Sequence, residues 1–246
     1  MNLDFTDKTV IITGGTRGIG AAIAQVFLKA GAQLLVTGTK DGNPKIQGLS
    51  DNNNIRYHQL DFSSDDCVNK FLDTVQKLKK IDVLINNAGV NKIESISNIS
   101  SKDWDWINTI NLKGPFLLTR AVSETMKKQN SGKIINVASI FGVISKEKRA
   151  AYSSTKWGLI GFTKAAALDM ACFNVQVNAV SPGFVDTELT RKILGRKEIK
   201  SLTERIPQGR LAKPEEIANV VLFLCSDLNT YITGENIVVD GGFTSA

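Results

Sequence analysis

The chain has 246 residues, of which 42% are hydrophobic and 22% charged, so it can bury a large α/β core and is not a disordered chain. A single histidine, His58, and three scattered cysteines argue against a His/Cys metal site, a Ser-His-Asp hydrolase and a disulfide framework. The 30 Lys and Arg exceed the 24 Asp and Glu by +6, which permits an anionic partner without naming one. No aromatic stacking platform accompanies the basic residues, so we expect no nucleic-acid partner. Because the chain has one histidine and no clustered cysteines, we also expect no metal site.

The sequence also bears on the compartment. Met1–Lys8 lacks a basic stretch followed by an apolar one, which a secretory signal would need. The longest apolar run, Val220–Cys225, is far shorter than the roughly 20 residues of a membrane span. We therefore expect a cytoplasmic protein with no membrane association.

Short apolar runs alternate with longer segments of helical period, and this alternation is typical of parallel βαβ units. It predicts one α/β domain over residues 1–246, built on a Rossmann-like, doubly wound, parallel seven-stranded sheet of order 3-2-1-4-5-6-7, with helices on both faces. A helix is expected after each strand, the last of them starting at Pro214. The expected strands are Thr9–Thr13, Leu34–Thr37, Ile55–Leu60, Val83–Asn86, Lys133–Ala138, Val175–Ser181 and Asn236–Val239. Ligands of such sheets bind beyond the carboxyl ends of the strands.

The first expected strand leads directly into the glycine-rich segment Thr13–Gly20, which opens the first helix. Gly14 would allow the tight turn, Gly18 the close approach of a phosphate, and Gly20 the packing of the helix on the sheet. Backbone N–H groups at a helix N-terminus suit an anionic pyrophosphate. We therefore predict a dinucleotide cofactor here, the alternative being a β-to-α turn without a ligand.

The end of the second strand bears on the choice between NADP and NAD. An NAD site usually places a carboxylate there to hold the ribose 2′-OH, and none stands at Gly38. Arg17, Thr39 and Lys40 could instead receive a 2′-phosphate, since charge-assisted contacts to phosphate are strong. Asp41 is the competing candidate, for NAD. NADP is the favoured cofactor and NAD the alternative.

Four polar residues form a candidate catalytic set. Tyr152 and Lys156 are four residues apart and share one face if the segment is helical. Ser139 follows the fifth strand, and Asn111 interrupts a long helical segment. In carbonyl reduction a Tyr would pass a proton to the developing alkoxide, a neighbouring Lys would lower the Tyr pKa, a Ser would polarise the carbonyl, and an Asn could hold a water for the relay. The plain alternatives are a surface Tyr–Lys pair, a Ser in a turn and an Asn that kinks a helix.

With these motifs in family order, the chain resembles the short-chain dehydrogenase/reductases over essentially its whole length. The resemblance also rests on Asp61, Asn86–Gly89 and Pro182-Gly183. It implies a dimer face on helices Lys102–Lys128 and Tyr152–Ala171, within a homotetramer or homodimer. The residues it implies for cofactor binding, beyond those named above, are Thr16, Ile19, Asp61, Phe62, Asn87, Ala88, Gly89, Pro182, Gly183, Val185 and Thr187, together with Tyr152 and Lys156.

Within that family the chain is most similar to bacterial 3-oxoacyl-(acyl carrier protein) reductases, which implies reduction of a ketone to a secondary alcohol on a carrier-linked or otherwise anionic small molecule. Those enzymes usually carry two arginines for the acidic carrier, where this chain has Asn130 and Phe173, with Lys127, Lys128 and Lys133 near the first. The charged segment Ser139–Arg149 suits a polar substrate instead. The alternative is therefore a sugar or sugar-phosphate oxidoreductase of polysaccharide or nucleotide-sugar synthesis, unless these charges only form a solvated loop. A non-catalytic cofactor sensor is a remote alternative.

Residues 186–213 lie where the family places a substrate lid. Eight basic residues against four acidic ones leave +4 in this segment. We expect a basic lid that attracts an anion. The alternative is an amphipathic surface helix whose charges lie in water.

Overall fold

The computed structural model describes residues 3–42, 44–49 and 52–246. Its seven strands form one parallel sheet in the order β3-β2-β1-β4-β5-β6-β7, which confirms the predicted topology. Two strands have the predicted ends, and the ends of the others differ from the prediction by one residue at most. The strands are β1 (Thr9–Ile12), β2 (Gln33–Gly38), β3 (Ile55–Gln59), β4 (Val83–Asn86), β5 (Gly132–Val137), β6 (Val175–Pro182) and β7 (Asn236–Val239).

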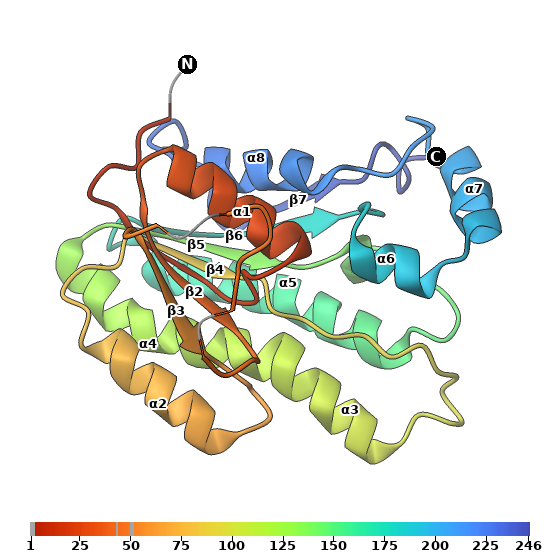
Figure 1. Ribbon diagram of the computed structural model, residues 1–246, viewed down its shortest axis with the longest axis horizontal. Helices are drawn as coiled ribbons and strands as arrows, with labels where there is room; N and C mark the ends of the chain where they lie inside the picture. The colour runs from red at the N-terminus through yellow and green to blue at the C-terminus, as the bar shows by residue number, and fades with distance from the viewer. Residues whose placement is uncertain (1–2, 43, 50–51) are drawn as a thin grey trace.

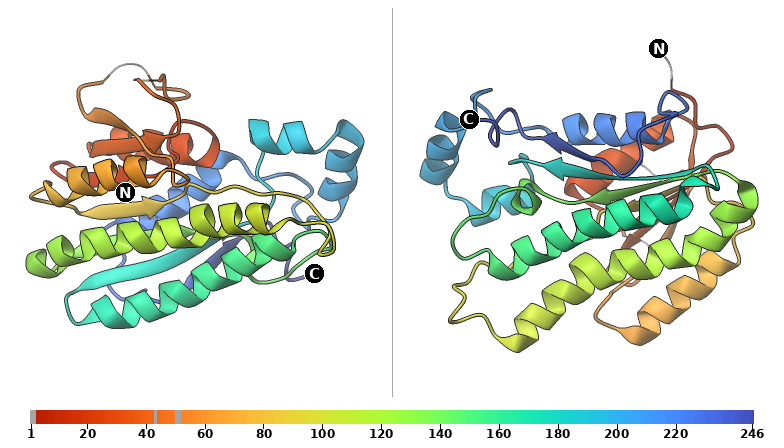
Figure 2. Two further views of the ribbon diagram at one scale, coloured as in Figure 1. Left: turned by 90° about the horizontal axis from the view of Figure 1, so that it is seen from below. Right: turned by 180° about the vertical axis from the view of Figure 1, so that it is seen from behind.

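Helices cover both faces of the sheet (Figure 1). On one face lie α1 (Gly18–Lys29) and α8 (Pro214–Cys225), which begins at the predicted proline. On the other lie α2 (Asp65–Gln76), α4 (Gly114–Gln129) and α5 (Ala150–Ala171). Helix α3 (Ser101–Asn108) runs into α4 through the π-helical turn η1 (Thr109–Lys113), and the 3-10 turn η2 (Ile140–Gly142) follows β5. The short helices α6 (Glu188–Ile193) and α7 (Arg196–Glu204) lie beyond the tip of β6 (Figures 1 and 2).

The core is explained by the alternation of side chains along the strands. Val10 and Ile12 of β1 pack with α1 and α8, whereas Ile11 packs with α2 and α4. All three side chains are fully buried. Burial of one such side chain contributes about 1.5–3 kcal/mol, so a strand covered on both faces must be apolar throughout.

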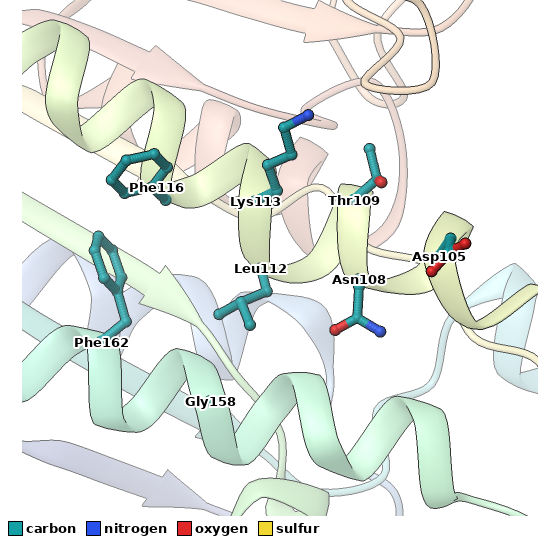
Figure 3. Close-up of a pocket in the computed structure, with 8 residues that line it drawn as sticks. All are labelled: Asp105, Asn108, Thr109, Leu112, Lys113, Phe116, Gly158 and Phe162. Atoms are coloured by element: carbon teal, nitrogen blue, oxygen red, sulfur yellow. The ribbon is translucent and has the colours of Figure 1, made fainter. Parts of the chain in front are cut away.

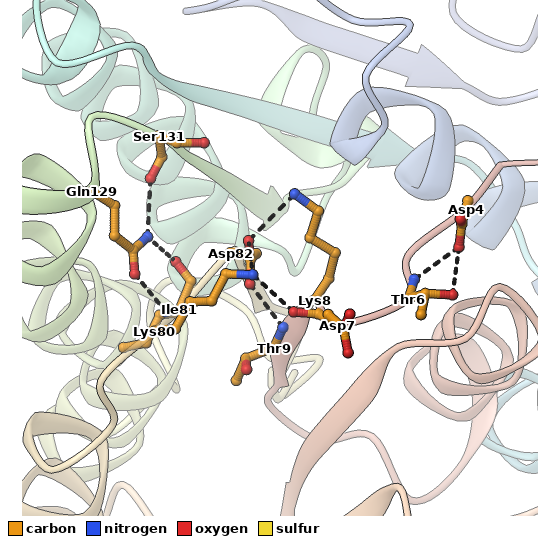
Figure 4. Close-up of polar contacts among 10 residues, drawn as sticks. All are labelled: Asp4, Thr6, Asp7, Lys8, Thr9, Lys80, Ile81, Asp82, Gln129 and Ser131. Carbon is orange, nitrogen blue, oxygen red and sulfur yellow. Dashed lines mark hydrogen bonds and ion pairs between the residues drawn. The ribbon is translucent and has the colours of Figure 1, made fainter.

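A polar network fixes the amino-terminal edge of the sheet (Figure 4). The Asp82 carboxylate accepts a hydrogen bond from the Thr9 N–H at 2.9 Å and lies 3.5 Å from the Lys8 ammonium. The Gln129 side chain bonds both the N–H and the carbonyl of Ile81, each at 2.9 Å. These contacts join β1, β4 and α4 at the amino ends of the strands. The predicted site residues gather at the opposite, carboxyl ends.

The prediction of a helix after every strand is wrong for the crossover from β2 to β3. The described part of that crossover, residues 39–42, 44–49 and 52–54, contains no helix. Gly42 and Gly48 have φ angles of 79° and 74°, and Pro44 has no N–H to donate, so the segment does not propagate a helix. Turns rather than a helix also follow β7.

Within the described ranges, no helix combines the length and the apolar character that crossing a membrane requires.

Candidate active site

The glycine turn between β1 and α1 has the geometry of a phosphate cradle. Gly14 and Gly18 have φ angles of 62° and 56°, which favour glycine. A Cβ on Gly20 would lie 2.3 Å from the Gly14 carbonyl oxygen, so only glycine fits there. Helix α1 begins at Gly18, and its N-cap residue Arg17 makes no side-chain cap. The N–H groups that follow Gly18 in the first turn are therefore placed to meet an anion, whereas the Gly18 N–H is bonded to a side chain of the crossover after β2.

A clamp from the end of β4 holds this turn in place. The Asn87 amide nitrogen donates to the carbonyls of Thr13 at 2.9 Å and Gly14 at 3.1 Å. In return the Thr13 hydroxyl accepts from the N–H groups of Asn87 and Ala88, both at 2.9 Å. Asn87 and Ala88 thus position the cradle through its backbone, and the exposed Gly89 follows them.

The residues predicted to meet the ribose lie exposed at the carboxyl ends of β1 and β2. Arg17, Thr39 and Lys40 are all exposed. Asp41 is also exposed, and its carboxylate accepts the N–H of Gly42 at 2.7 Å, as expected for a loop tip. Two cationic side chains thus stand at this end of the sheet, next to the cradle.

The end of β3 carries two residues that the resemblance implies for cofactor binding, Asp61 and Phe62. Asp61 accepts the Ser63 N–H at 2.8 Å and is partly exposed. Phe62 is buried against Gly114, where a Cβ would lie 2.9 Å from the ring. Phe62 therefore packs under the site, and Asp61 is the polar group that borders it.

A contact that the sequence did not reveal involves Gln47. Its side-chain oxygen accepts the Gly18 N–H at 3.1 Å, and its own N–H donates to the Thr16 carbonyl at 3.0 Å. Gln25 donates to the Gln47 carbonyl at 2.8 Å. The helix-free crossover therefore lies against the cradle. No local pattern could indicate this pairing, because it joins segments about 30 residues apart.

The candidate catalytic residues meet where α5 passes the end of β5. Tyr152 and Lys156 lie one turn apart on α5, and the Lys156 ammonium is 5.6 Å from the centroid of the Tyr152 ring. The ammonium is buried and donates to the Val137 carbonyl at 2.8 Å. Ser139 lies two residues after the end of β5, and its hydroxyl accepts the Phe141 N–H at 3.1 Å. The structure brings all three side chains together.

Asn111 lies in the π-helical turn η1, within a segment for which we expected one continuous helix. Its amide oxygen accepts the Val90 N–H at 2.8 Å, and its nitrogen donates to the Val90 carbonyl at 2.9 Å and to the Thr155 hydroxyl at 3.2 Å. A Cβ on Gly89 would lie 3.5 Å from the Asn111 oxygen and 3.6 Å from the Lys156 nitrogen. Asn111 therefore borders the same site and holds the loop after β4. Thr155, its buried partner, was missed by the sequence analysis.

Burial perturbs both titrating side chains of the set. Desolvation of the hydroxyl raises the pKa of Tyr152, while a hydrogen bond with Ser139 and then the charge of Arg149 act in the lowering direction. Burial lowers the pKa of Lys156 from 10.5 to about 8. Perturbed groups of this kind gather at functional sites. The charge predicted to lower the pKa of Tyr152 was that of Lys156, whereas in the structure it is that of Arg149.

The end of β6 borders the cradle. Pro182 ends the strand, and a Cβ on Gly183 would lie 2.7 Å from the Cα of Asp240. Thr187 caps α6 by accepting the Thr190 N–H at 3.2 Å. A Cβ on Gly18 would lie 3.6 Å from a Thr187 methyl carbon, so the segment that leads to α6 starts beside the glycine turn.

Ion pairs flank residues 186–213. Val185 forms a parallel bridge with Ala212, which joins the two ends of the segment. Arg191 makes two contacts with Asp186, at 2.6 and 2.7 Å. Near the other end of the segment, Arg210 makes two contacts with Glu216 of α8, both at 2.7 Å. Asp186 is already counted in the +4 of the segment, whereas Glu216 lies outside it and offsets one further positive charge.

The structure also corrects one candidate for carrier binding. Lys133 is half-buried, and its ammonium donates to the Gln176 side chain and, at 2.6 Å, to the Asn229 carbonyl. It cannot replace an exposed arginine. Lys146 and Lys148 are exposed, as a solvated loop requires.

An open groove of about 630 Å³ lies between η1–α4 and α5, on the helices for which the resemblance implies a dimer face (Figure 3). Exposed apolar side chains occur on the same helices, with Phe116 43%, Trp157 53% and Leu168 81% exposed. The groove is lined by Asp105, Asn108, Thr109, Leu112, Lys113, Phe116, Gly158 and Phe162. None of these is a candidate catalytic residue.

The parallel sheet, the glycine turn and the Ser139, Tyr152 and Lys156 group together define a class of oxidoreductase, and the chain belongs to the short-chain dehydrogenase/reductase family. A family model described as "Enoyl-(Acyl carrier protein) reductase" matches residues 14–244. The resemblance inferred from the sequence is confirmed.

Individual relatives span the whole chain. The 3-oxoacyl-[acyl-carrier-protein] reductase FabG of Aquifex aeolicus is 40% identical, covering 98% of this chain and 99% of the relative. A provisional NAD(P)-dependent gluconate 5-dehydrogenase of Beutenbergia cavernae, solved with NADP at low occupancy, is 30% identical, with a TM-score of 0.92 and complete coverage of both chains. A 4-hydroxyisoleucine dehydrogenase mutant, solved with NADH and succinate, is 31% identical, with a TM-score of 0.89, and covers 97% of this chain and 99% of its own.

Proposed function

We propose that this protein is an NADPH-dependent reductase that converts a ketone into a secondary alcohol, with 3-oxoacyl thioesters as the first substrate class. The supporting observation is that Lys156 is buried beside Tyr152 and that Ser139 lies within hydrogen-bonding reach of Tyr152. All three lie at the carboxyl end of the sheet, which also carries the glycine cradle. The similarity to the Aquifex reductase supports the same reaction.

The cradle fits a dinucleotide because Gly14 and Gly20 let the backbone of the turn pack closely against itself and against Asn87 and Ala88, and because no side chain stands at Gly18, where a pyrophosphate would approach. Arg17 and Lys40 supply positive charge for a 2′-phosphate, with Thr39 beside them. Asp61 would hold the adenine end of the cofactor, and the N–H groups that follow Gly18 at the start of α1 would hold the pyrophosphate. Asn87 holds the glycine turn in place through its backbone carbonyls, and Thr187 lies beside Gly18 on the other side of the turn. When bound, the reduced nicotinamide supplies the hydride.

The chain's own residues handle the proton. The Ser139 hydroxyl donates a hydrogen bond to the substrate carbonyl and polarises it. The Tyr152 phenol gives its proton to the oxygen as the alkoxide forms, and becomes a phenolate. The Lys156 ammonium stabilises that phenolate, and Asn111 supports the return of a proton from solvent. With its pKa near 8, Lys156 can exchange protons close to neutral pH.

Residues 186–213 form the substrate cover of this proposal. They begin beside the cradle and carry α6 and α7 beyond the tip of β6 (Figure 1). They therefore stand over the carboxyl end of the sheet, and Tyr152 lies on α5 at the same end. The ion pairs at Asp186 and Glu216 fix the points from which this cover extends.

A second candidate is a sugar or sugar-acid oxidoreductase. Asn130 ends α4 with a φ angle of 50°, and Phe173 lies under the Lys127 ammonium, so neither position presents a guanidinium to an acidic carrier. The likeness to the provisional gluconate 5-dehydrogenase supports this alternative. Parallel assays of acetoacetyl thioesters and of a panel of oxidised sugars and sugar acids separate the two. Turnover of sugars alone contradicts the thioester proposal, and turnover of neither supports a cofactor sensor.

The cofactor is tested by kinetics with NADPH and NADH, side by side. We expect a preference for NADPH that Arg17→Ala reduces roughly tenfold by removing one charge-assisted contact. An unchanged preference in the variant contradicts the role of Arg17.

The proposed assembly is a homodimer, within a tetramer, formed by packing α4 and α5 against a second copy. The exposed Phe116, Trp157 and Leu168 of these helices support it, since exposed apolar groups of this size are typical of interfaces. Light scattering at the mass of one chain contradicts it.

A further inference from the structure

Arg149 carries a buried donor without an acceptor. It directly precedes α5 and stands three residues before Tyr152. Its Nη1 atom is buried and, among the described residues, has no hydrogen-bond partner. Buried polar groups are nearly always satisfied, and charged ones left unsatisfied are costly. An acceptor that arrives with a ligand would remove this cost.

The guanidinium is held close to the reacting groups by an aromatic ring. Its central carbon lies 5.4 Å from the centroid of the Phe141 ring. The same ring meets the Tyr152 ring edge-on, with centroids 6.3 Å apart, and the Phe141 N–H donates to the Ser139 hydroxyl at 3.1 Å. Phe141 thus contacts the candidate proton donor and the carbonyl-polarising serine, and it holds Arg149 beside both.

No acid in the described part of the chain pairs with this cation. Within the described ranges, Arg149 forms no ion pair shorter than 4.0 Å. Its neighbour Glu147 is exposed and instead lies 3.6 Å from Lys146. Arg149 itself is partly exposed, so its side chain is open to an approaching anionic group.

We propose that Arg149 is a substrate-binding residue that recognises an anionic oxygen group, a carboxylate or a phosphate, a few bonds from the carbonyl that is reduced. The inference rests on the proposed ketone reduction and narrows its substrate class to anionic ketones, which favours the second candidate, a sugar or sugar-acid substrate, over the 3-oxoacyl thioesters. A thioester is uncharged at this place, whereas an oxo acid or a sugar acid carries the required group. A guanidinium suits such groups because its planar N–H donors match two oxygens at once.

Two pairs of ketones that differ in the charged group test this. Acetoacetate is compared with ethyl acetoacetate, and dihydroxyacetone phosphate with dihydroxyacetone, in the wild type, Arg149→Gln and Lys146→Gln. Lys146→Gln removes an equal charge from an exposed position. A hydrogen bond to a charged group corresponds to roughly 10- to 100-fold in kcat/KM. We expect Arg149→Gln to lose that factor for one anionic ketone relative to its neutral partner, mainly through KM, beyond any loss common to both ketones that follows from removing the charge near Tyr152. The affected pair identifies carboxylate or phosphate.

Equal losses for the charged and neutral members, or the same loss in Lys146→Gln, overturn the proposal. Arg149→Lys and thermal unfolding of each variant separate a binding defect from a folding defect. If the wild type reduces no ketone, the proposed function fails separately. The arginine site is then decided by thermal stabilisation with acetoacetate or dihydroxyacetone phosphate. Stabilisation of the wild type but not of Arg149→Gln supports the site, and its absence with both probes refutes it.

Discussion

Replacement of Lys156 by Met should abolish activity and yet stabilise the fold. The Lys156 side chain is 4% exposed, and burial lowers its pKa to about 8. At neutral pH the folded protein therefore holds a charged ammonium in a site that favours the neutral amine. Methionine has a similar length and no charge, so it removes this penalty.

The magnitude follows from the pKa values of the folded and unfolded states. The difference between 10.5 and about 8 corresponds to about 3 kcal/mol of unfolding free energy. The variant also loses the 2.8 Å hydrogen bond from Lys156 to the Val137 carbonyl, which costs about 1 kcal/mol. The expected net gain at pH 7 is therefore about 2 kcal/mol.

The same reasoning fixes the sign of the pH dependence. Below the folded-state pKa of about 8 both states bind the proton, and the penalty is fully present. Between about 8 and 10.5 the unfolded chain binds more protons than the folded one, so the unfolding free energy of the wild type rises relative to that of Lys156→Met. Above that interval the variant should be the less stable of the two.

Urea unfolding of both proteins, at equal concentration and in steps from pH 7 to pH 10.5, measures this difference. Lys164→Met, at an exposed position on the same helix, is the control and should show no such change. A stability difference between the wild type and Lys156→Met that does not change with pH would refute the reasoning.

Two further outcomes are expected. Gly20→Ala should lower the unfolding free energy by about 1–3 kcal/mol and weaken NADPH binding, because the new Cβ meets backbone at 2.3 Å; Gly161→Ala in α5, with no atom within 4 Å, should be neutral or stabilising by up to about 1 kcal/mol. Thermal unfolding and fluorescence titration check both, and equal effects contradict the cradle geometry. The Arg210 guanidinium holds the pKa of Glu216 at about 2, below its ordinary 4.5, so Glu216→Gln should cost about 1 kcal/mol or less at pH 7, given the exposure of the pair. That cost should disappear as the pH falls from 4.5 toward 2, and a cost that persists in acid contradicts the assignment.

The sheet could be predicted because its signals are local. Apolar runs such as Val83–Asn86 mark strands buried on both faces, and their alternation with helical segments implies parallel order. The crossover from β2 was predicted wrongly because the rule of alternation outweighed Gly42, Pro44 and Gly48, which oppose a helix. The π-helical turn at Asn111 was also beyond prediction. Its amide is satisfied by Val90 and Thr155, from segments distant in sequence.

In the candidate site, too, residues with a local sequence signal were predicted and residues positioned by distant contacts were not. Tyr152 and Lys156 were recognised by their spacing, and Ser139 by its place after a strand. Arg149 and Gln47 were not recognised, since no local pattern distinguishes a loop residue that contacts the site from one that does not. Their roles depend on Phe141 and on the glycine turn, which only the fold brings to them.

The central claim is that Tyr152 delivers the proton to the reduced carbonyl. The most direct measurement is single-turnover oxidation of NADPH by the wild type and by Tyr152→Phe with the best ketone of the panel, beside a fluorescence titration of NADPH. We expect the variant to bind NADPH within about twofold of the wild type and to lose roughly 100- to 10,000-fold in rate, the range of general acid catalysis. A rate equal to that of the wild type would contradict the account.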